Sequence, residues 1–283
     1  MEFEKWHALG NDYVIMEARR LPFELTSGRI RAICAPNTGV CADGIVLLSA
    51  PDDPSRVARL RIFNPDGSEA EVSGNGAREA ILYLRRHGWT DADSFAVETA
   101  SGELRPRILS ETECAVDMGR ARLRSADFPL GPPDGRGELV ADGRSWGFQH
   151  VQVGNPQCAI RVEDDAELER LDLQAIGPEI EHHELFPNRT NTSWFTVLEP
   201  GRIRARIFER GAGETTASGT GATGAAVASV LDGGRSPVTV VLDGGELEVE
   251  VGEDLQIKLS GWAVPVYRGT LAEAFIEELH ATQ

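Results

Sequence analysis

The sequence predicts an α+β protein built from two similar domains. A segment of 18 residues at 63–80, FNPDGSEAEVSGNGAREA, recurs at 208–225 as FERGAGETTASGTGATGA, with seven identities in register. The offset of 145 residues is about half of the 283-residue chain, and the dipeptide Gly-Asn at residues 10–11 recurs at 154–155. Self-similarity at a nearly fixed offset indicates two copies of one structural unit. Strand-like runs outnumber helical ones in both halves, which favours an α+β fold.

The elements of the first half follow from alternation, capping and turn residues. Residues 2–17 are typical of two strands around a turn at residues 10–12, and Thr26 or Ser27 is placed to cap a short helix that ends near Cys34. Residues 57–63 alternate as a strand does, and residues 77–86 have helical spacing before a stop at Gly88. Further strands are expected at residues 94–99, 104–109 and 113–117.

The second half repeats this order. After the turn at residues 154–156 we expect a helix at 171–182, then strands, the second glycine-rich turn, and a helix at 222–231. Strands are expected at residues 237–242, 246–251 and 256–259, followed by a last helix at 271–279. The Pro/Gly-rich residues 128–136, FPLGPPDGR, are the best candidate for a linker. We expect an N-terminal domain at residues 1–118, with a C-terminal helical segment at 265–283 packed back on it, and a C-terminal domain at 119–264.

Composition excludes several classes of function. The net charge of −17 argues against binding nucleic acid or an anionic membrane surface, because both need a basic footprint. Neither a secretion leader nor an apolar run of roughly 20 residues is found, so we expect a cytoplasmic protein. The four cysteines have no CxxC spacing and are expected to be reduced thiols. With few histidines and no ligand-like spacing, no metal site is expected.

The repeated segments carry the best candidate site. In both, a serine, Ser73 or Ser218, precedes a glycine-rich turn that opens a helix. Glycine lets the backbone approach a ligand closely, and a helix N-terminus offers free N–H groups and a positive dipole end to a carboxylate or phosphate. The alternative is that both serines only cap their helices. The duplication favours a binding role.

Polar residues at turns and strand ends complete the candidate site. The asparagines are Asn11, Asn64, Asn75, Asn155 and Asn191. Each alone is more typical of a turn, but as a set they offer amides suited to amino-acid groups. Glu209 and Arg210 add an acid and a cation beside the second turn, where their alternative role is a surface ion pair. No turn matches a P-loop or a dinucleotide fingerprint.

A pocket with two matching walls suits a racemase or epimerase. Such an enzyme removes a proton from one face of a carbon and delivers another to the opposite face, and two opposed acid/base groups achieve this.

The motifs resemble those of the diaminopimelate epimerase family along essentially the whole chain. They are HALGNDYVIME, CADGIVLL, FNPDGSEAEVSGNGARE, VGNPQCA, HHELFPNRTN and FERGAGETTASGTGA. The resemblance implies two domains, each a barrel-like, mainly antiparallel sheet around a central helix, with the active site between them. It implies interconversion of LL- and meso-diaminopimelate in lysine and peptidoglycan biosynthesis, without cofactor or metal, by a homodimer.

The resemblance also assigns site residues, with one departure. The two catalytic cysteines of the family fall on Ser73 and Ser218. The acidic tuning residue is retained as Glu209, whereas the other, often a histidine, is Gln157. Substrate contacts carry over to Asn11, Asn64, Gly74, Asn75, Asn155, Asn191, Glu209, Arg210, Gly219 and Thr220.

The serines predict poor catalysis or none. A thiol has a pKa of about 8.5 and yields a thiolate, whereas a serine hydroxyl is a far weaker acid that needs a strong neighbouring base. We expect that Gln157 cannot supply that base to Ser73. Three explanations stay open. The chain is a working epimerase whose thiols were replaced by hydroxyls, or a related isomerase or ligand-binding relative with natural serines, or a cofactor-free isomerase of a non-amino-acid substrate in which a carboxylate such as Glu209 is the base.

Overall fold

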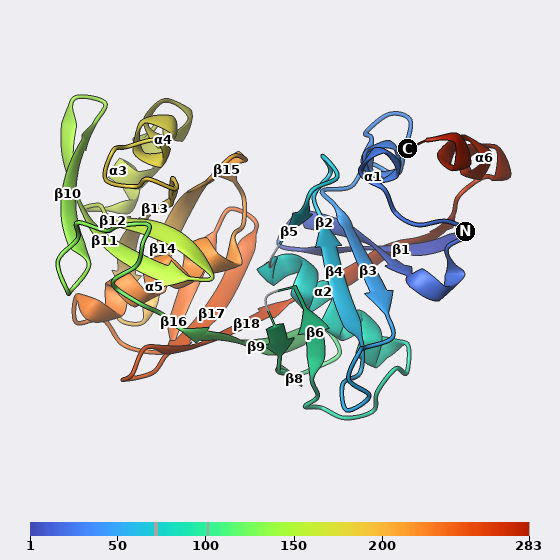
Figure 1. Cartoon of the computed structure of the whole chain (residues 1–283). Coiled ribbons are helices and arrows are strands. Elements are labelled where there is room, and N and C mark those ends of the chain that lie inside the picture. The colour runs from blue at the N-terminus through green and yellow to red at the C-terminus, as the bar shows by residue number, and fades with distance from the viewer. Residues whose placement is uncertain (71–72, 101, 283) are drawn as a thin grey trace. The chain divides into compact units, whose positions relative to one another are not determined.

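The computed structural model describes residues 1–70, 73–100 and 102–282. The chain divides into two compact units, and Figure 1 shows both. Unit 1 comprises Met1–Val116 and Gly261–Gln283, and unit 2 comprises Asp117–Ser260. The chain passes from one unit to the other within strands β9 (Glu113–Arg120) and β18 (Gln256–Trp262).

Unit 1 is a mixed sheet packed on one central helix. The strand order is β19-β1-β2-β3-β4-β6-β7, and β5 pairs with β4. Helix α2 (Gly74–Arg86) packs on β1 to β4 (Figure 1). Its apolar face, which includes Ile81 and Leu84, is buried. The remaining elements of this unit are β1 (Glu2–Ala8), β2 (Asn11–Glu17), the 3-10 turn Ala18–Arg20, α1 (Ser27–Cys34), β3 (Ile45–Ser49), β4 (Arg59–Phe63), β5 (Glu69–Ala70), β6 (Val97–Thr99), β7 (Gly102–Leu104), β8 (Pro106–Ile108), β19 (Val264–Thr270) and α6 (Glu273–Ala281).

Unit 2 has the same design around helix α5 (Gly219–Leu231). Its strands follow the order β10-β11-β12-β13-β14-β16-β17-β18, and β15 pairs with β14. Figure 1 shows α5 against these strands. The small residues of α5 let the strands approach closely, since a Cβ at Gly221 would lie 2.8 Å from Ile207. The other elements are β10 (Arg136–Ala141), β11 (Arg144–Val153), β12 (Asn155–Arg161), α3 (Asp165–Arg170), α4 (Leu173–Glu181), β13 (Asn191–Glu199), β14 (Arg202–Glu209), β15 (Gly213–Thr215), β16 (Val238–Leu242) and β17 (Gly245–Val251).

The strand pairing confirms the predicted repeat. In unit 1, β1 and β2 pair antiparallel, β2 and β3 parallel, β3 and β4 antiparallel, and β4 and β6 parallel. In unit 2, β11, β12, β13, β14 and β16 pair in the same senses and the same order. The two Gly-Asn dipeptides occupy equivalent turns, where Gly10 has φ 87° and Gly154 has φ 76°. The α+β fold of two similar units, each with a central helix, is therefore confirmed.

Two predictions about segments are wrong. Residues 128–136 lie inside unit 2 and are no linker, because Phe128 is buried against Phe148 and Phe186. Residues 264–270 form strand β19, which pairs antiparallel with β1, so the C-terminal helix begins only at Glu273. The β-branched and aromatic residues of VPVYRGT favour a strand there. Helix α6 itself packs in unit 1, where Arg29 Nε donates to Leu279 O at 2.7 Å.

The longest helices, α2 and α5, have 13 residues each. No helix in the described ranges is long and apolar enough to cross a membrane.

Candidate functional site

Ser73 and Ser218 both cap their helices. Ser73 Oγ accepts from Gly76 N at 3.1 Å, and Ser218 Oγ accepts from Gly221 N at 3.2 Å. Both serines have extended backbone angles, as N-cap residues do. Both serines therefore act as N-caps. The first two N–H groups of each helix have no partner inside the helix and point out of its end. They belong to Gly74 and Asn75 in α2 and to Gly219 and Thr220 in α5. Such an end suits a carboxylate.

Ser218 lies against a carboxylate. Its hydroxyl donates to Glu209 Oε2 at 2.8 Å, and Thr215 Oγ1 donates to Glu209 Oε1 at 2.8 Å. Burial raises the pKa of Glu209, and the two hydroxyl donors offset part of this rise. We call Glu209, Thr215 and Ser218 the Ser218 cluster. Because its carboxylate accepts a hydrogen bond from the serine hydroxyl and has a raised pKa, this cluster is suited to taking up a proton.

Ser73 lies against a phenol instead. Tyr13 Oη donates to Ser73 Oγ at 3.1 Å, so this oxygen receives two donors, the phenol and Gly76 N–H. Asn75 Nδ2 donates to Asn11 Oδ1 at 3.2 Å beside it. We call Asn11, Tyr13, Ser73 and Asn75 the Ser73 cluster. An oxygen that already accepts two hydrogen bonds is poor at accepting a proton, so this cluster is suited to giving one.

Three of the predicted amides have structural partners. Asn64 forms the turn after β4, donating through Nδ2 to Ser68 Oγ at 2.9 Å. Asn155 Oδ1 accepts from Gln157 Nε2 at 2.6 Å. Asn191 is buried, and its Oδ1 accepts from Arg210 N at 2.8 Å while its Nδ2 donates to Pro156 O at 3.0 Å.

Glu209 and Arg210 point to different partners. The Arg210 guanidinium donates to Asn188 O at 2.9 Å and its side chain is exposed, while Glu209 faces Ser218. The alternative of a surface ion pair between them is therefore wrong. Gln157 is fully buried and packs against α5. A Cβ added at Gly224 of this helix would lie 2.8 Å from the Cβ of Gln157. Its Oε1 has no hydrogen-bond partner among the described residues.

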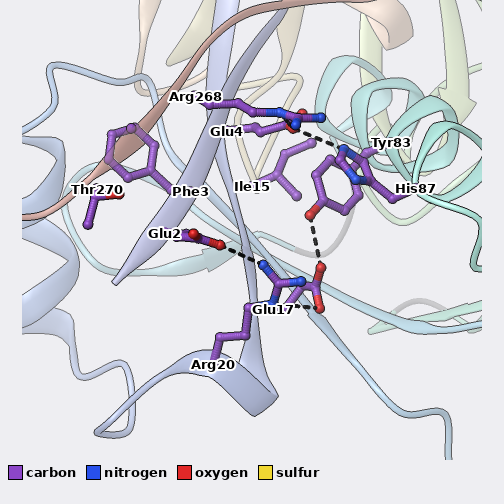
Figure 2. Close-up of a pocket in the computed structure, with 11 residues that line it drawn as sticks. Glu2, Phe3, Glu4, Ile15, Glu17, Arg20, Tyr83, His87, Arg268 and Thr270 are labelled. Atoms are coloured by element: carbon purple, nitrogen blue, oxygen red, sulfur yellow. Dashed lines mark hydrogen bonds and ion pairs between the residues drawn. The ribbon is translucent and has the colours of Figure 1, made fainter.

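A cavity of about 400 Å³ in unit 1 contains none of the predicted site residues. Several charged side chains in its walls pair with one another, as Figure 2 shows. Glu17 accepts from Tyr83 Oη at 3.0 Å, and His87 Nε2 lies 3.0 Å from Glu4 Oε1. The lining residues are Glu2, Phe3, Glu4, Ile15, Glu17, Arg20, Tyr83, His87, Arg268, Gly269 and Thr270. Across residues 1–70, 73–100 and 102–282, no three His, Cys, Asp or Glu residues are grouped to hold a metal ion.

Two contacts were not predicted from the sequence, that of Tyr13 with Ser73 and that of Thr215 with Glu209. Tyr13 follows Asn11 by two residues on one strand, so both side chains point to the same face, and this spacing was a usable signal. Thr215 lies on β15, which pairs with β14 next to Glu209, and only the strand pairing brings the two together.

Comparison with known proteins identifies the family. The family model described as Diaminopimelate epimerase matches residues 3–124 and 149–265. A diaminopimelate epimerase of Synechococcus sp. (strain JA-3-3Ab) is 40% identical over 282 residues, covering 96% of this chain and 99% of the relative. One of Pelotomaculum thermopropionicum is 42% identical over 280 residues, covering 95% and 98%.

Among solved structures, a predicted epimerase from Pseudomonas aeruginosa has a TM-score of 0.68 at 18% identity, covering 95% of this chain and 98% of that one. This likeness supports the fold. With both the family model and relatives matching nearly the full length, the chain belongs to the diaminopimelate epimerase family.

Proposed function

We propose that this protein is a cofactor-independent amino-acid epimerase that binds diaminopimelate, with Ser73 and Ser218 at its two acid/base positions. The observation that carries the proposal is the pair of serine hydroxyls at equivalent helix N-caps of two units with the same topology. One hydroxyl faces a carboxylate and the other a phenol, which divides the task into a base and an acid.

We propose the following binding roles. The helix ends at Gly74–Asn75 and Gly219–Thr220 hold the α-carboxylate at the reacting carbon, because their N–H groups suit an anion. Asn11 lies within hydrogen-bond distance of Asn75 and belongs with the first of these ends. The amino-acid group at the far end of the substrate is held by Asn64, Asn155, Asn191 and Arg210.

We propose that turnover is slow because serines stand where the family resemblance places cysteines. A hydroxyl is a much weaker acid than a thiol, so little of the alkoxide base forms at neutral pH. Glu209 partly compensates for the weak acidity of Ser218, because its Oε2 accepts a hydrogen bond from the Ser218 hydroxyl at 2.8 Å. Gln157 has no acid or base group to assist either serine.

Calorimetry tests binding. We expect heat on titration with LL- and with meso-diaminopimelate, and a weaker signal with lysine, which lacks one carboxylate. No heat with either isomer would contradict the substrate assignment.

Restoring the thiols tests catalysis. The double variant Ser73→Cys, Ser218→Cys should exchange the α-proton of diaminopimelate with deuterium from solvent at least about 100-fold faster than the unchanged protein, the scale of general acid–base catalysis. The matched control is Cys41→Ser, which alters an exposed thiol of unit 1. A folded double variant without exchange would count against an epimerase.

A second candidate is an isomerase in which Glu209 itself is the base. The raised pKa of Glu209 and its contact with Ser218 favour it. In that case Glu209→Gln would abolish the reaction of the unchanged protein, and Ser218→Ala would preserve it. A ligand-binding relative would instead bind without exchange, even after both serines are changed to cysteine.

We also propose a homodimer, on the family resemblance. Sedimentation velocity at micromolar concentration would check it, and a single monomeric species would contradict it.

A further inference from the structure

Four side chains of unit 1 form one continuous chain of hydrogen bonds. Arg78 Nη2 donates to Asn75 Oδ1 at 2.5 Å, Asn75 Nδ2 donates to Asn11 Oδ1 at 3.2 Å, and Asn11 Nδ2 donates to Asp43 Oδ2 at 2.9 Å. Arg78 is fully buried and Asn75 nearly so, whereas Asp43 is exposed. The chain therefore runs from the core to the surface through two of the proposed substrate residues. We refer to these four residues as the amide relay.

The two ends of the amide relay fix its direction. A guanidinium can only donate hydrogen bonds, and a carboxylate can only accept them. Turning the Asn75 amide over would set its NH₂ against the NH₂ of Arg78, and turning Asn11 over would set its carbonyl against the carboxylate of Asp43. Both amides are therefore held in one orientation by charges at opposite ends.

Secondary contacts hold each end in place. Arg78 Nη1 donates to Gly74 O at 2.9 Å, inside the first turn of α2. Asp43 Oδ2 also accepts from Asp12 N at 3.0 Å, and Asp43 N donates to Asp12 Oδ1 at 3.2 Å. Asp12 is in turn paired with Lys5, whose Nζ lies 3.1 Å from it. Neither end of the relay can rotate freely.

Each amide of the relay keeps one N–H that the relay does not use. These two N–H groups add to the backbone N–H groups of Gly74 and Asn75 at the start of α2. A surface of N–H donors suits a carboxylate and is unfavourable for an ammonium group, because an ammonium can only donate.

We propose that Arg78 and Asp43 are positioning residues that orient Asn75 and Asn11 so that unit 1 selects a carboxylate of the substrate. The proposal rests on the proposed function in one respect, namely that Asn11 and Asn75 contact the substrate. Unit 2 has threonines, Thr220 and Thr223, at the positions equivalent to Asn75 and Arg78. Thr223 Oγ1 donates to Gly219 O at 2.8 Å, as Arg78 does to Gly74 O, but cannot extend a relay of amides.

The first experiment needs no substrate. The side-chain amide NMR signals of Asn11 and Asn75 are recorded without substrate in the unchanged protein and in the variants Arg78→Met and Asp43→Asn, and their chemical shifts are compared. We expect both amides to shift in both variants, although Arg78 contacts only Asn75 and Asp43 only Asn11. The control is Arg85→Met, which alters a half-buried arginine of the same helix that pairs with Asp91 and contacts no residue of the relay. A shift confined to the directly contacted amide would overturn the relay, and Asp43→Asn decides this alone if the buried Arg78→Met does not fold.

The second experiment measures the dissociation constant for diaminopimelate. Each single variant should weaken binding about tenfold, the scale of one hydrogen bond to a charged group. Because both act on one relay, the double variant should be no more than about threefold weaker than either single variant. Arg78→Lys, which keeps a charged donor, should bind more tightly than Arg78→Met. Additive losses near 100-fold, or lower thermal stability with unchanged binding, would overturn the proposal.

The two experiments separate this proposal from the proposed function. If the unchanged protein binds neither isomer, the substrate assignment fails, while the NMR result still decides whether the relay exists.

Discussion

The Ser73 and Ser218 clusters have the same backbone and opposite chemistry. In both, a serine caps the central helix with a hydrogen bond from the N–H three residues later, at 3.1 and 3.2 Å. The Ser218 hydroxyl donates a hydrogen bond to Glu209, whereas Ser73 Oγ accepts a hydrogen bond from the Tyr13 hydroxyl. A repeated backbone can thus place a serine at the same helix end in both units while giving it different hydrogen-bond partners.

The difference arises at two equivalent positions of the repeat. The residue after the phenylalanine that begins both repeated segments is Asn64 in unit 1 and Glu209 in unit 2. The residue two positions after the turn asparagine is Tyr13 in unit 1 and Gln157 in unit 2. At the first position, Glu209 contacts Ser218, whereas Asn64 donates to Ser68 within a turn. At the second position, Tyr13 contacts Ser73, whereas Gln157 donates to Asn155. The residues at these two positions therefore account for the different partners of the two serines.

Removing the carboxylate of the Ser218 cluster should have the largest effect. Glu209→Gln should lower solvent exchange about 100-fold in the Ser73→Cys, Ser218→Cys background, because the acceptor for the proton is lost. Exchange is measured by NMR in deuterated solvent. The control, Glu214→Gln, changes a carboxylate of the neighbouring strand that pairs with Arg206. Equal rates in both variants would show that Glu209 is no base.

Removing the phenol of the Ser73 cluster should have a smaller effect. Tyr13→Phe removes the hydroxyl that contacts residue 73 and keeps the ring that packs against Gly76. In the same background, where residue 73 is a cysteine, we expect about a tenfold loss of epimerisation, because the phenol no longer donates to the group at this position. The control, Tyr267→Phe, alters an exposed tyrosine of unit 1. The comparison between the clusters fails if Tyr13→Phe leaves the rate unchanged.

The caps should differ modestly in stability. Ser73→Ala and Ser218→Ala each delete an N-cap, which costs about 1 kcal/mol. Ser218→Ala should cost more, by about 1 kcal/mol, because it also takes a donor from the half-buried Glu209. Urea unfolding measures both, and an equal loss would mean that the Ser218–Glu209 contact contributes nothing.

The two units should also respond oppositely to pH. Burial alone would raise the pKa of Glu4 in the cavity of Figure 2, but hydrogen bonds from Trp6 and His87 and the charge of Arg268 lower it below its usual value of 4.5. Glu4 therefore stabilises unit 1 above that pH, and the stabilisation is lost as the pH falls through its lowered pKa. The raised pKa of Glu209 acts in reverse, destabilising unit 2 as the pH rises through and above 4.5.

Unfolding at pH 4 and pH 7 measures this difference. Glu4→Gln should destabilise the protein more at pH 7 than at pH 4, and Glu209→Gln should be relatively more favourable at pH 7. The acid limb of the exchange rate should lie above pH 4.5 and disappear in Glu209→Gln. The same pH trend for both variants would contradict the opposite pKa shifts.

Local patterns predicted much of this fold. The repeat located both central helices, and the serine-glycine turns located their N-caps, because capping and helix formation are encoded within a few neighbouring residues. The chain crosses between the units within strands β9 and β18, close to the boundaries at residues 118 and 264 that the sequence indicated. The Pro/Gly-rich residues 128–136 were wrongly predicted to be a linker, because turns inside a domain also use proline and glycine.

The site was predicted only in part because its decisive contacts join distant residues. Tyr13 meets Ser73 across 60 residues, and Asn11 meets Asp43 across 32. Such contacts depend on which strands pair and in which register, and a single sequence does not reveal this. The roles of Asn64, Asn155 and Asn191 could not be separated from turn formation. The structure gives Asn64 and Asn155 partners within four residues and gives Asn191 a partner 35 residues away.

The most direct test of the division into base and acid is deuterium uptake from each isomer separately. With the unchanged serines, the protein is incubated in deuterated solvent with LL- or with meso-diaminopimelate, and the α-protons are followed by NMR. We predict slow uptake at the reacting α-carbon from both isomers, because an epimerisation that runs in one direction also runs in reverse, and none from either isomer after Glu209→Gln removes the carboxylate beside Ser218. No uptake from either isomer with the unchanged serines, or uptake that survives Glu209→Gln, would contradict the assignment.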